Sequence, residues 1–110
     1  MSDEWKNKSR DLIAQLTEGK FAEVHAGCSS EMAGAISVQQ LDDMWSGLLG
    51  QAGAFKSFVE NHYKEIDGYH TTLNLIELER GKLVVRLVYD SAGALAGLHF
   101  QPAPPDDPAS

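Results

Sequence analysis

Three tight-turn signals in the second half of the chain constrain its fold more than any other feature. They are Asp67-Gly68, Arg80-Gly81 and the segment from Asp90 to Gly93, and they contain the residue types that short hairpin loops need. They separate four runs, near residues 55–66, 69–79, 82–90 and 94–101. Loops this short join antiparallel neighbours, so the sequence predicts a four-stranded antiparallel meander in the order 1-2-3-4.

The first half of the chain has helical patterns instead. Ser37 and Gln40 match a capping box, and the apolar residues that follow fall on one continuous helical face. Helices are expected near residues 3–17, 20–26, 30–35 and 38–50. Packed on the meander, they give an α+β fold in which Trp45 is buried between helix and sheet.

Composition and charge exclude several classes of protein. With 43% hydrophobic and 23% charged residues, the chain is expected to form one domain over residues 1–101, followed by a proline-rich acidic tail or linker at 102–110. Nine Lys and Arg against 16 Asp and Glu give a net charge of -7, which argues against a nucleic-acid partner. No run approaches the ~20 apolar residues that span a bilayer, so no membrane partner is expected. Without an apolar leader the chain as given is expected in the cytoplasm, although a mature secreted domain preceded by Met would look the same.

The turn lengths fix which residues face each other across the sheet. A two-residue loop at Arg80-Gly81 gives the pairs Leu78–Leu83, Ile76–Val85, Asn74–Leu87 and Thr72–Tyr89. A two-residue loop at Asp67-Gly68 gives the pairs Val59–Ile76, Asn61–Asn74 and Tyr63–Thr72. The face that holds all these residues is the better candidate for the core, and it is aliphatic at one end and polar at the other.

The polar end of that face is the candidate ligand site. Buried polar groups without partners are costly, so this end must be hydrogen-bonded internally, wet, or open to a ligand. A sheet wrapped on helices and polar at its wide end predicts a conical pocket for a small molecule with a neutral or acidic group. The predicted ligand-binding residues are Asn61, Tyr63, Thr72, Asn74 and Tyr89 from the sheet, with Trp45 or its neighbour Leu49 closing the site from the helical side.

The last hairpin has two solutions. A three-residue loop over residues 91–93 turns His99 toward the core beside Val85, and places Leu98 and Phe100 outside. A four-residue loop over residues 90–93 turns Ala96, Leu98 and Phe100 inward and His99 outward. The number of apolar residues on the inner face favours the second solution slightly, and the sequence leaves the choice open.

The opposite, outer face of the sheet is predicted to carry an apolar patch. Its members by register are Leu73, Leu75, Val84 and Val88, with Phe58 nearby. A contiguous exposed apolar patch usually marks an interface. We therefore expect a homodimer through the outer face, related by a two-fold axis.

Residues that could bind a metal or attack a substrate are sparse. His25 and Cys28 have the spacing of two ligands on one helical turn, but zinc needs three or four protein ligands and no second pair stands nearby. The single cysteine is expected to be a buried small hydrophobe, since nothing close in sequence lowers its pKa. No metal and no cofactor are expected.

Several turn and core segments resemble those of a bacterial family. The segments are Gly53-Ala-Phe-Lys-Ser57, Gly68-Tyr69, Glu79-Arg-Gly-Lys-Leu83 and Gly93-Ala-Leu-Ala-Gly-Leu-His-Phe-Gln-Pro102. They resemble the small domain of unknown function that commonly precedes α/β-hydrolase domains, within the broad NTF2-like, cystatin-like α+β group. The resemblance covers about residues 8–102; it implies the conical fold and brings no catalytic residue with it.

Three function classes follow. The first is a non-catalytic module that binds a small molecule or another protein. The alternatives are a small enzyme of the NTF2-like type, acting as an isomerase, hydratase or hydrolase, and an accessory domain of an α/β-hydrolase. A pocket filled by the domain's own side chains would favour the accessory role.

Overall fold

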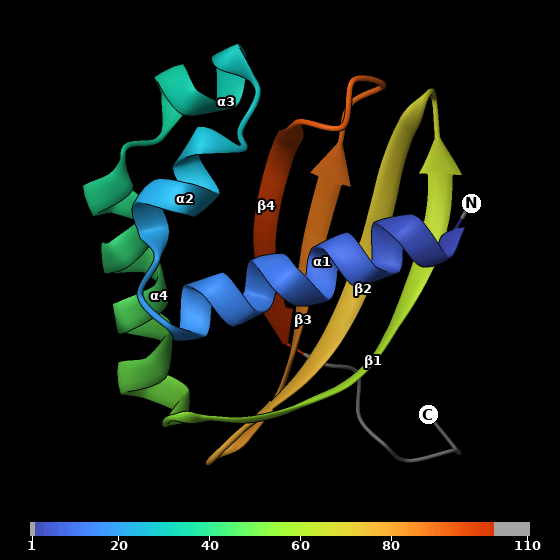
Figure 1. Cartoon of the computed structure of the whole chain (residues 1–110). Helices are drawn as coiled ribbons and strands as arrows, with labels where there is room; N and C mark the ends of the chain where they lie inside the picture. Colours follow the sequence, from blue (N-terminus) through green and yellow to red (C-terminus); the bar gives the residue numbers. More distant parts are fainter. Residues whose placement is uncertain (1, 103–110) are drawn as a thin grey trace.

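The computed structural model describes residues 2–102 of the 110-residue chain. Of the expected tail at 102–110, Pro102 is the last residue of the final strand, and residues 103–110 lie outside the described residues. Four helices are followed by four strands, as the sequence predicts (Figure 1). The helices are α1 (Ser2–Thr17), α2 (Phe21–Ala26), α3 (Ser30–Ala35) and α4 (Val38–Ala52). The strands are β1 (Phe55–Ile66), β2 (Tyr69–Leu78), β3 (Gly81–Tyr89) and β4 (Leu95–Pro102).

The strands form one antiparallel sheet in the order β1-β2-β3-β4, which confirms the predicted meander and the α+β class. Helix α1 runs across the strands, while α2, α3 and α4 are grouped beside it on the β4 side (Figure 1). Trp45 of α4 is 3% exposed, and its ring centroid lies 6.0 Å from that of Phe100 on β4. The prediction of a buried Trp45 is therefore confirmed. None of the helices within residues 2–102 combines the length and apolar character that crossing a membrane requires.

Helix α4 begins at the predicted capping box. Ser37 Oγ accepts from the backbone N–H of Gln40 at 3.1 Å, and the Gln40 side chain accepts from the N–H of Ser37 at 2.8 Å. At its other end α4 is held by the β2–β3 turn. The guanidinium of Arg80 donates to the carbonyl of Gln51 at 3.0 Å, and its own backbone N–H donates to the carbonyl of Ala52 at 2.8 Å. The turn therefore fixes where the helix ends against the sheet.

The predicted β2–β3 register was wrong by two residues, because the turn lies where it contacts the end of α4. The two-residue turn is Glu79-Arg80, since β2 ends at Leu78 and β3 begins at Gly81. Gly81 does not adopt the positive φ that a glycine-dependent turn at Arg80-Gly81 would use. The pairing moves by two residues, so Asn74 faces Val85 instead of Leu87, and Tyr89 faces His70 instead of Thr72. Because the shift is even, every side chain keeps its predicted face.

Strand β1 contains bulges that the sequence did not reveal. The predicted Asp67-Gly68 turn is present, with φ of 53° and 83° at its two residues. The ladder follows the prediction as far as Glu60, but an irregularity between Phe58 and Glu60 then places Phe58 opposite Ile76. The expected position of Val59 on the core side was wrong, because Val59 is 43% exposed. Phe58 packs against the core instead of lying near the outer patch.

The last hairpin follows the second of the two predicted solutions in its facing. Phe100 pairs with Val85 and Leu98 with Leu87 on the inner face, while His99 pairs with Arg86 on the outer face. Ala96 does not pair as that solution required, because a bulge falls between the pairs of Val88 and Tyr89. Leu95, 1% exposed, fills the inner position opposite Tyr89.

Candidate functional site

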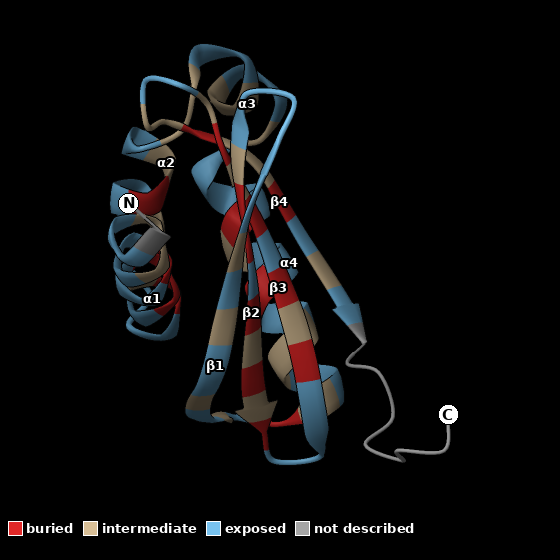
Figure 2. Ribbon diagram, turned by 90° about the vertical axis from the view of Figure 1, so that its right-hand side faces the viewer, coloured by how far each residue is buried: buried red, intermediate tan, exposed pale blue. Residues whose placement is uncertain are grey.

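The structure brings the predicted polar residues together on the inner face of the sheet. Asn61 pairs with Asn74 and Tyr63 with Thr72, as the β1–β2 register predicts. Thr72, Asn74 and Tyr89 are each 0% exposed, and Asn61 and Tyr63 are half-buried. Figure 2 shows this buried stripe along β2 and β3, with α1 on one side of the sheet. The inner face therefore has a polar end, and its buried polar side chains need hydrogen-bond partners.

Ser9 of helix α1 is a hydrogen-bond partner of two of these buried side chains. The Ser9 hydroxyl lies 2.6 Å from the Thr72 hydroxyl and 2.9 Å from that of Tyr89, and it is fully buried. Ser9 lies in line with the apolar face of this helix, which is made by Trp5, Leu12, Ile13 and Leu16. A serine within an otherwise apolar stripe was the available signal for this contact, and it was not recognised from the sequence.

The two asparagines complete the network. Asn74 Nδ2 donates to Thr72 Oγ1 and to the carbonyl of Val85, each at 3.0 Å. Asn61 Nδ2 donates to Asn74 Oδ1 at 3.1 Å and to the carbonyl of Lys6 on α1 at 3.0 Å. Among the described residues, no buried side-chain nitrogen or oxygen lacks a partner. Of the three possibilities for this end, the structure shows internal hydrogen bonding, in which Ser9 of α1 contacts Thr72 and Tyr89.

An aromatic cluster closes the outer part of the same end. Tyr63 and His70 share a hydrogen bond of 2.6 Å between the hydroxyl and Nδ1. The Trp5 ring stacks on His70 with centroids 4.1 Å apart, and lies 5.3 Å from Tyr89. Lys8 Nζ lies over the rings of Trp5 and Tyr89 and donates to the carbonyl of Gly93. These contacts join α1 to β2, β3 and the β3–β4 loop, and they join β1 to β2.

The two helical residues predicted to close the site lie elsewhere in the packing. Trp45 contacts Phe100 on β4, and Leu49 packs as a partly buried residue against the hydrophobic core. The cover over the polar residues comes from α1, because α1 crosses β1 and β2 where those residues lie (Figure 1).

The two tyrosines of this region have pKa values raised above the ordinary value, which favours their neutral forms. Burial raises the pKa of Tyr89 to about 12, although the hydrogen bond from Ser9 opposes the shift. Desolvation, followed by the charge of Glu65, raises the pKa of Tyr63. Burial also raises the pKa of the Cys28 thiol. A nucleophile or general base needs the opposite shift, so none of these groups is activated.

His25 and Cys28, the pair with the spacing of two metal ligands, contact backbone carbonyls of the α2–α3 region. His25 Nε2 lies 2.9 Å from the carbonyl of Ile36, and Cys28 Sγ lies 3.5 Å from that of Val24. Both side chains therefore bond to the backbone of the α2–α3 region. Within residues 2–102, no three His, Cys, Asp or Glu side chains gather as metal ligands.

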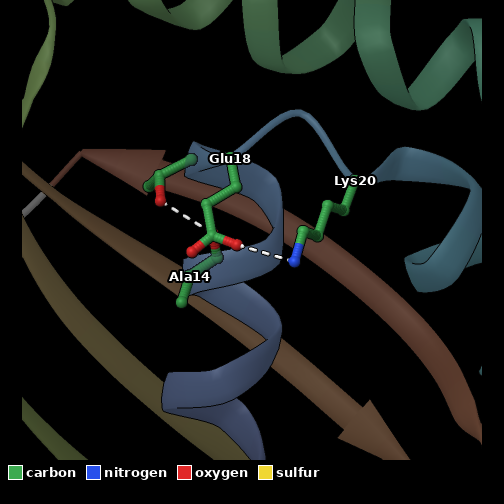
Figure 3. A network of polar contacts seen from close by, with 4 residues as sticks. Ala14, Glu18 and Lys20 are labelled. Carbon is green, nitrogen blue, oxygen red and sulfur yellow. Dashed lines mark hydrogen bonds and ion pairs between the residues drawn. The ribbon is translucent and has the colours of Figure 1, made fainter.

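A surface ion pair marks the corner between α1 and α2. Lys20 Nζ lies 3.1 Å from Glu18 Oε1, and both side chains are about half exposed. Figure 3 shows this ion pair. The hydrogen bond and charge of Glu18 raise the pKa of Lys20. Exposed pairs of this kind contribute little to stability, so the pair belongs to the helix connection and not to a site.

The outer face of the sheet is the second candidate site. Leu73 is 39% exposed, and Leu75, Val84 and Val88 are half-buried, as the register predicts. Two shallow hollows, of about 320 and 370 Å³, adjoin on this face and share His62, Leu73 and Gln101 in their walls. Leu75 and Val84 line the first hollow. No helix within residues 2–102 covers this face (Figures 1 and 2).

Comparisons with known proteins match the fold-bearing part of the chain. A curated protein, Esterase EstD of Thermotoga maritima, is 27% identical over 93 residues, which are 84% of this chain and 22% of that protein. The chain therefore spans about a fifth of the length of the curated relative it matches. No solved structure matches, and the expected kinship to the NTF2-like group stays a prediction. Residues 9–98 match the family described as "Protein of unknown function (DUF3887)". Because that match covers most of the chain, the chain belongs to the DUF3887 family.

Proposed function

We propose that this chain is a non-catalytic interaction domain, of the kind that forms an accessory part of longer hydrolases. The observation that carries the proposal is the occupied polar end of the inner face. Ser9 of α1 takes the place that a ligand would need beside Thr72 and Tyr89. A domain closed in this way acts through its surface.

Two further observations support the accessory role. Tyr63, Tyr89 and Cys28 all have raised pKa values, which disfavour the charged forms that covalent or general-base chemistry uses. The matched relative is named an esterase and is far longer than this chain, so its matching segment is a minor part of it. We infer that the catalytic machinery of such proteins lies outside the segment shared with this chain.

The proposal is tested by assaying the purified chain for ester hydrolysis and for ligand binding. With p-nitrophenyl acetate and butyrate, the expected rate equals that of buffer. In a thermal-shift screen of metabolites, no compound is expected to raise Tm. A ligand present at 100 times its dissociation constant would add about 2.7 kcal/mol to stability, so a binder would be visible.

A matched pair of variants shows whether any rate that appears belongs to the inner face. Tyr63→Phe removes the hydroxyl that lies 2.6 Å from His70, and Tyr69→Phe removes a hydroxyl from a tyrosine that is 48% exposed. Hydrolysis above buffer that Tyr63→Phe abolishes and Tyr69→Phe preserves would overturn the proposal. So would a metabolite whose stabilisation is lost in Tyr63→Phe alone.

A further inference from the structure

The uncovered outer face of the sheet carries an inference that rests on the proposed function and names its partner. We propose that this face binds the same face of a second copy of the chain, across a two-fold axis parallel to the strands. The β1–β2 half of one copy then lies over the β3–β4 half of the other. The outer surface is defined here as the outward residues of β1 to β4 between Ser57 and Gln101.

The shape of the outer surface is the first reason. Leu73 is its most exposed aliphatic residue on the two central strands, and it stands at the border between the two hollows. In the proposed arrangement Leu75 faces Val84 of the second copy, and by symmetry Val84 faces Leu75 of the second copy. Both residues line the smaller hollow, so each copy covers the hollow of the other. An exposed leucine beside an apolar hollow is the self-complementary shape that an isologous interface needs.

The distribution of charge is the second reason. The outward acids are Glu60 on β1 and Glu77 on β2, while β3 carries Lys82 and Arg86 and β4 carries no acid. A two-fold axis along the strands therefore sets the acidic half of one copy over the basic half of the other. The remaining outward cation, Lys64, faces Gly97 of the second copy.

The distribution of net charge favours this face over the rest of the surface as the place where a second copy binds. The chain as a whole has 16 acids against nine bases, so two copies repel each other over most of their surface. On the outer surface the balance is reversed, with Glu60 and Glu77 against Lys64, Lys82 and Arg86. Like-charge repulsion between copies is therefore smallest here.

The size of the outer surface sets the expected affinity. Four strands spaced by about 4.8 Å and roughly eight residues of about 3.3 Å give a face of about 500 Å² for each copy. The two copies together would bury about 1,000 Å², the lower end for a specific interface. We therefore expect a reversible dimer with a dissociation constant in the micromolar range.

Sedimentation equilibrium of the full chain tests the surface. The wild type is expected to change from the 12.0 kDa species to twice that mass as concentration rises through the micromolar range. Leu75→Glu places a charge opposite Val84 of the second copy and is expected to weaken the dimer by on the order of 100-fold. Met44→Glu on α4 is the matched control, since Met44 is 37% exposed on another surface, and it is expected to leave the dimer unchanged.

Charge reversal tests the two-fold arrangement. Glu60 lies within side-chain reach of Arg86 of the second copy, so Glu60→Lys and Arg86→Glu are each expected to weaken self-association by on the order of tenfold. In an equimolar mixture, one chain carries Glu60→Lys and the other carries Arg86→Glu, so the two substituted side chains have opposite charges and face each other. Opposite charges then face each other again across the interface, so the mixture is expected to associate more tightly than either variant alone. That recovery excludes misfolding as the cause of the single-variant losses.

Three results would overturn the inference. A wild type that stays at 12.0 kDa through hundreds of micromolar leaves the face to a different partner. A dimer that tolerates Leu75→Glu uses another surface, and a mixture that fails to recover rules out the proposed axis. None of these results bears on the hydrolysis and ligand assays above, so the two proposals fail separately.

Discussion

Replacing Asn74 with leucine is expected to lower the free energy of unfolding by about 3 kcal/mol. Asn74 is 0% exposed and donates to both Thr72 and the Val85 carbonyl, while its oxygen accepts from Asn61. Leucine has a similar volume but satisfies none of these groups. The cost is that of leaving several polar groups without partners in a dry interior. Urea denaturation followed by circular dichroism measures the change.

The same substitution at an exposed asparagine is the control. Asn7 lies on the solvent side of α1, so Asn7→Leu is expected to change the free energy of unfolding by less than about 0.5 kcal/mol. A loss below about 1 kcal/mol at Asn74 would contradict the closed network, because it would mean that water or a ligand replaces the lost partners.

Replacing Gly53 with alanine is expected to cost about 3 kcal/mol or more. Gly53 ends α4 with φ 88° and ψ -179°, a combination that is almost confined to glycine. A Cβ at this position would lie 2.6 Å from Glu79 Cβ, which belongs to the turn that anchors the helix. Glu79 also accepts the Ala54 N–H at 2.8 Å, so the side chain cannot move away without breaking a second contact.

A glycine inside the same helix provides the comparison. A Cβ at Gly47 meets no atom within 4 Å, and alanine is the better helix former. Gly47→Ala is therefore expected to stabilise the domain by up to about 1 kcal/mol. If both substitutions had the same effect in urea denaturation, the anchoring role of the β2–β3 turn would be wrong.

Much of the fold could be predicted from motifs of neighbouring residues, and a one-residue error in placing a turn did not change the predicted faces of the sheet. The capping box at Ser37 and the Asp67-Gly68 turn are set by residues next to each other in sequence, and both are confirmed. The β2–β3 turn was misplaced by one residue, because its position depends on hydrogen bonds to the end of α4. That error moved the pairing by two and kept every face, since side chains alternate with a period of two.

The positions of the bulges and the contact of α1 with the polar end could not be predicted from sequence patterns. A bulge in β1 exchanged the places of Val59 and Phe58, and periodicity does not show where a strand gains a residue. The polar stripe itself was located from the register. What fills it depends on how α1 crosses the sheet, which brings Ser9 to Thr72 across 63 residues of sequence. Long-range placement of that kind leaves only the faint signal of a serine in an apolar stripe.

The outer face of the sheet is proposed as the working surface of a domain whose inner face is closed. Methyl-resolved NMR spectra of the wild type across a dilution series test this most directly. Concentration-dependent shifts are predicted for the methyl groups of Leu73, Leu75 and Val84, and constant shifts for the buried Leu12 and Ile76. Outer-face methyl signals that do not move with concentration, or movement confined to the inner face and α1, would contradict the proposal.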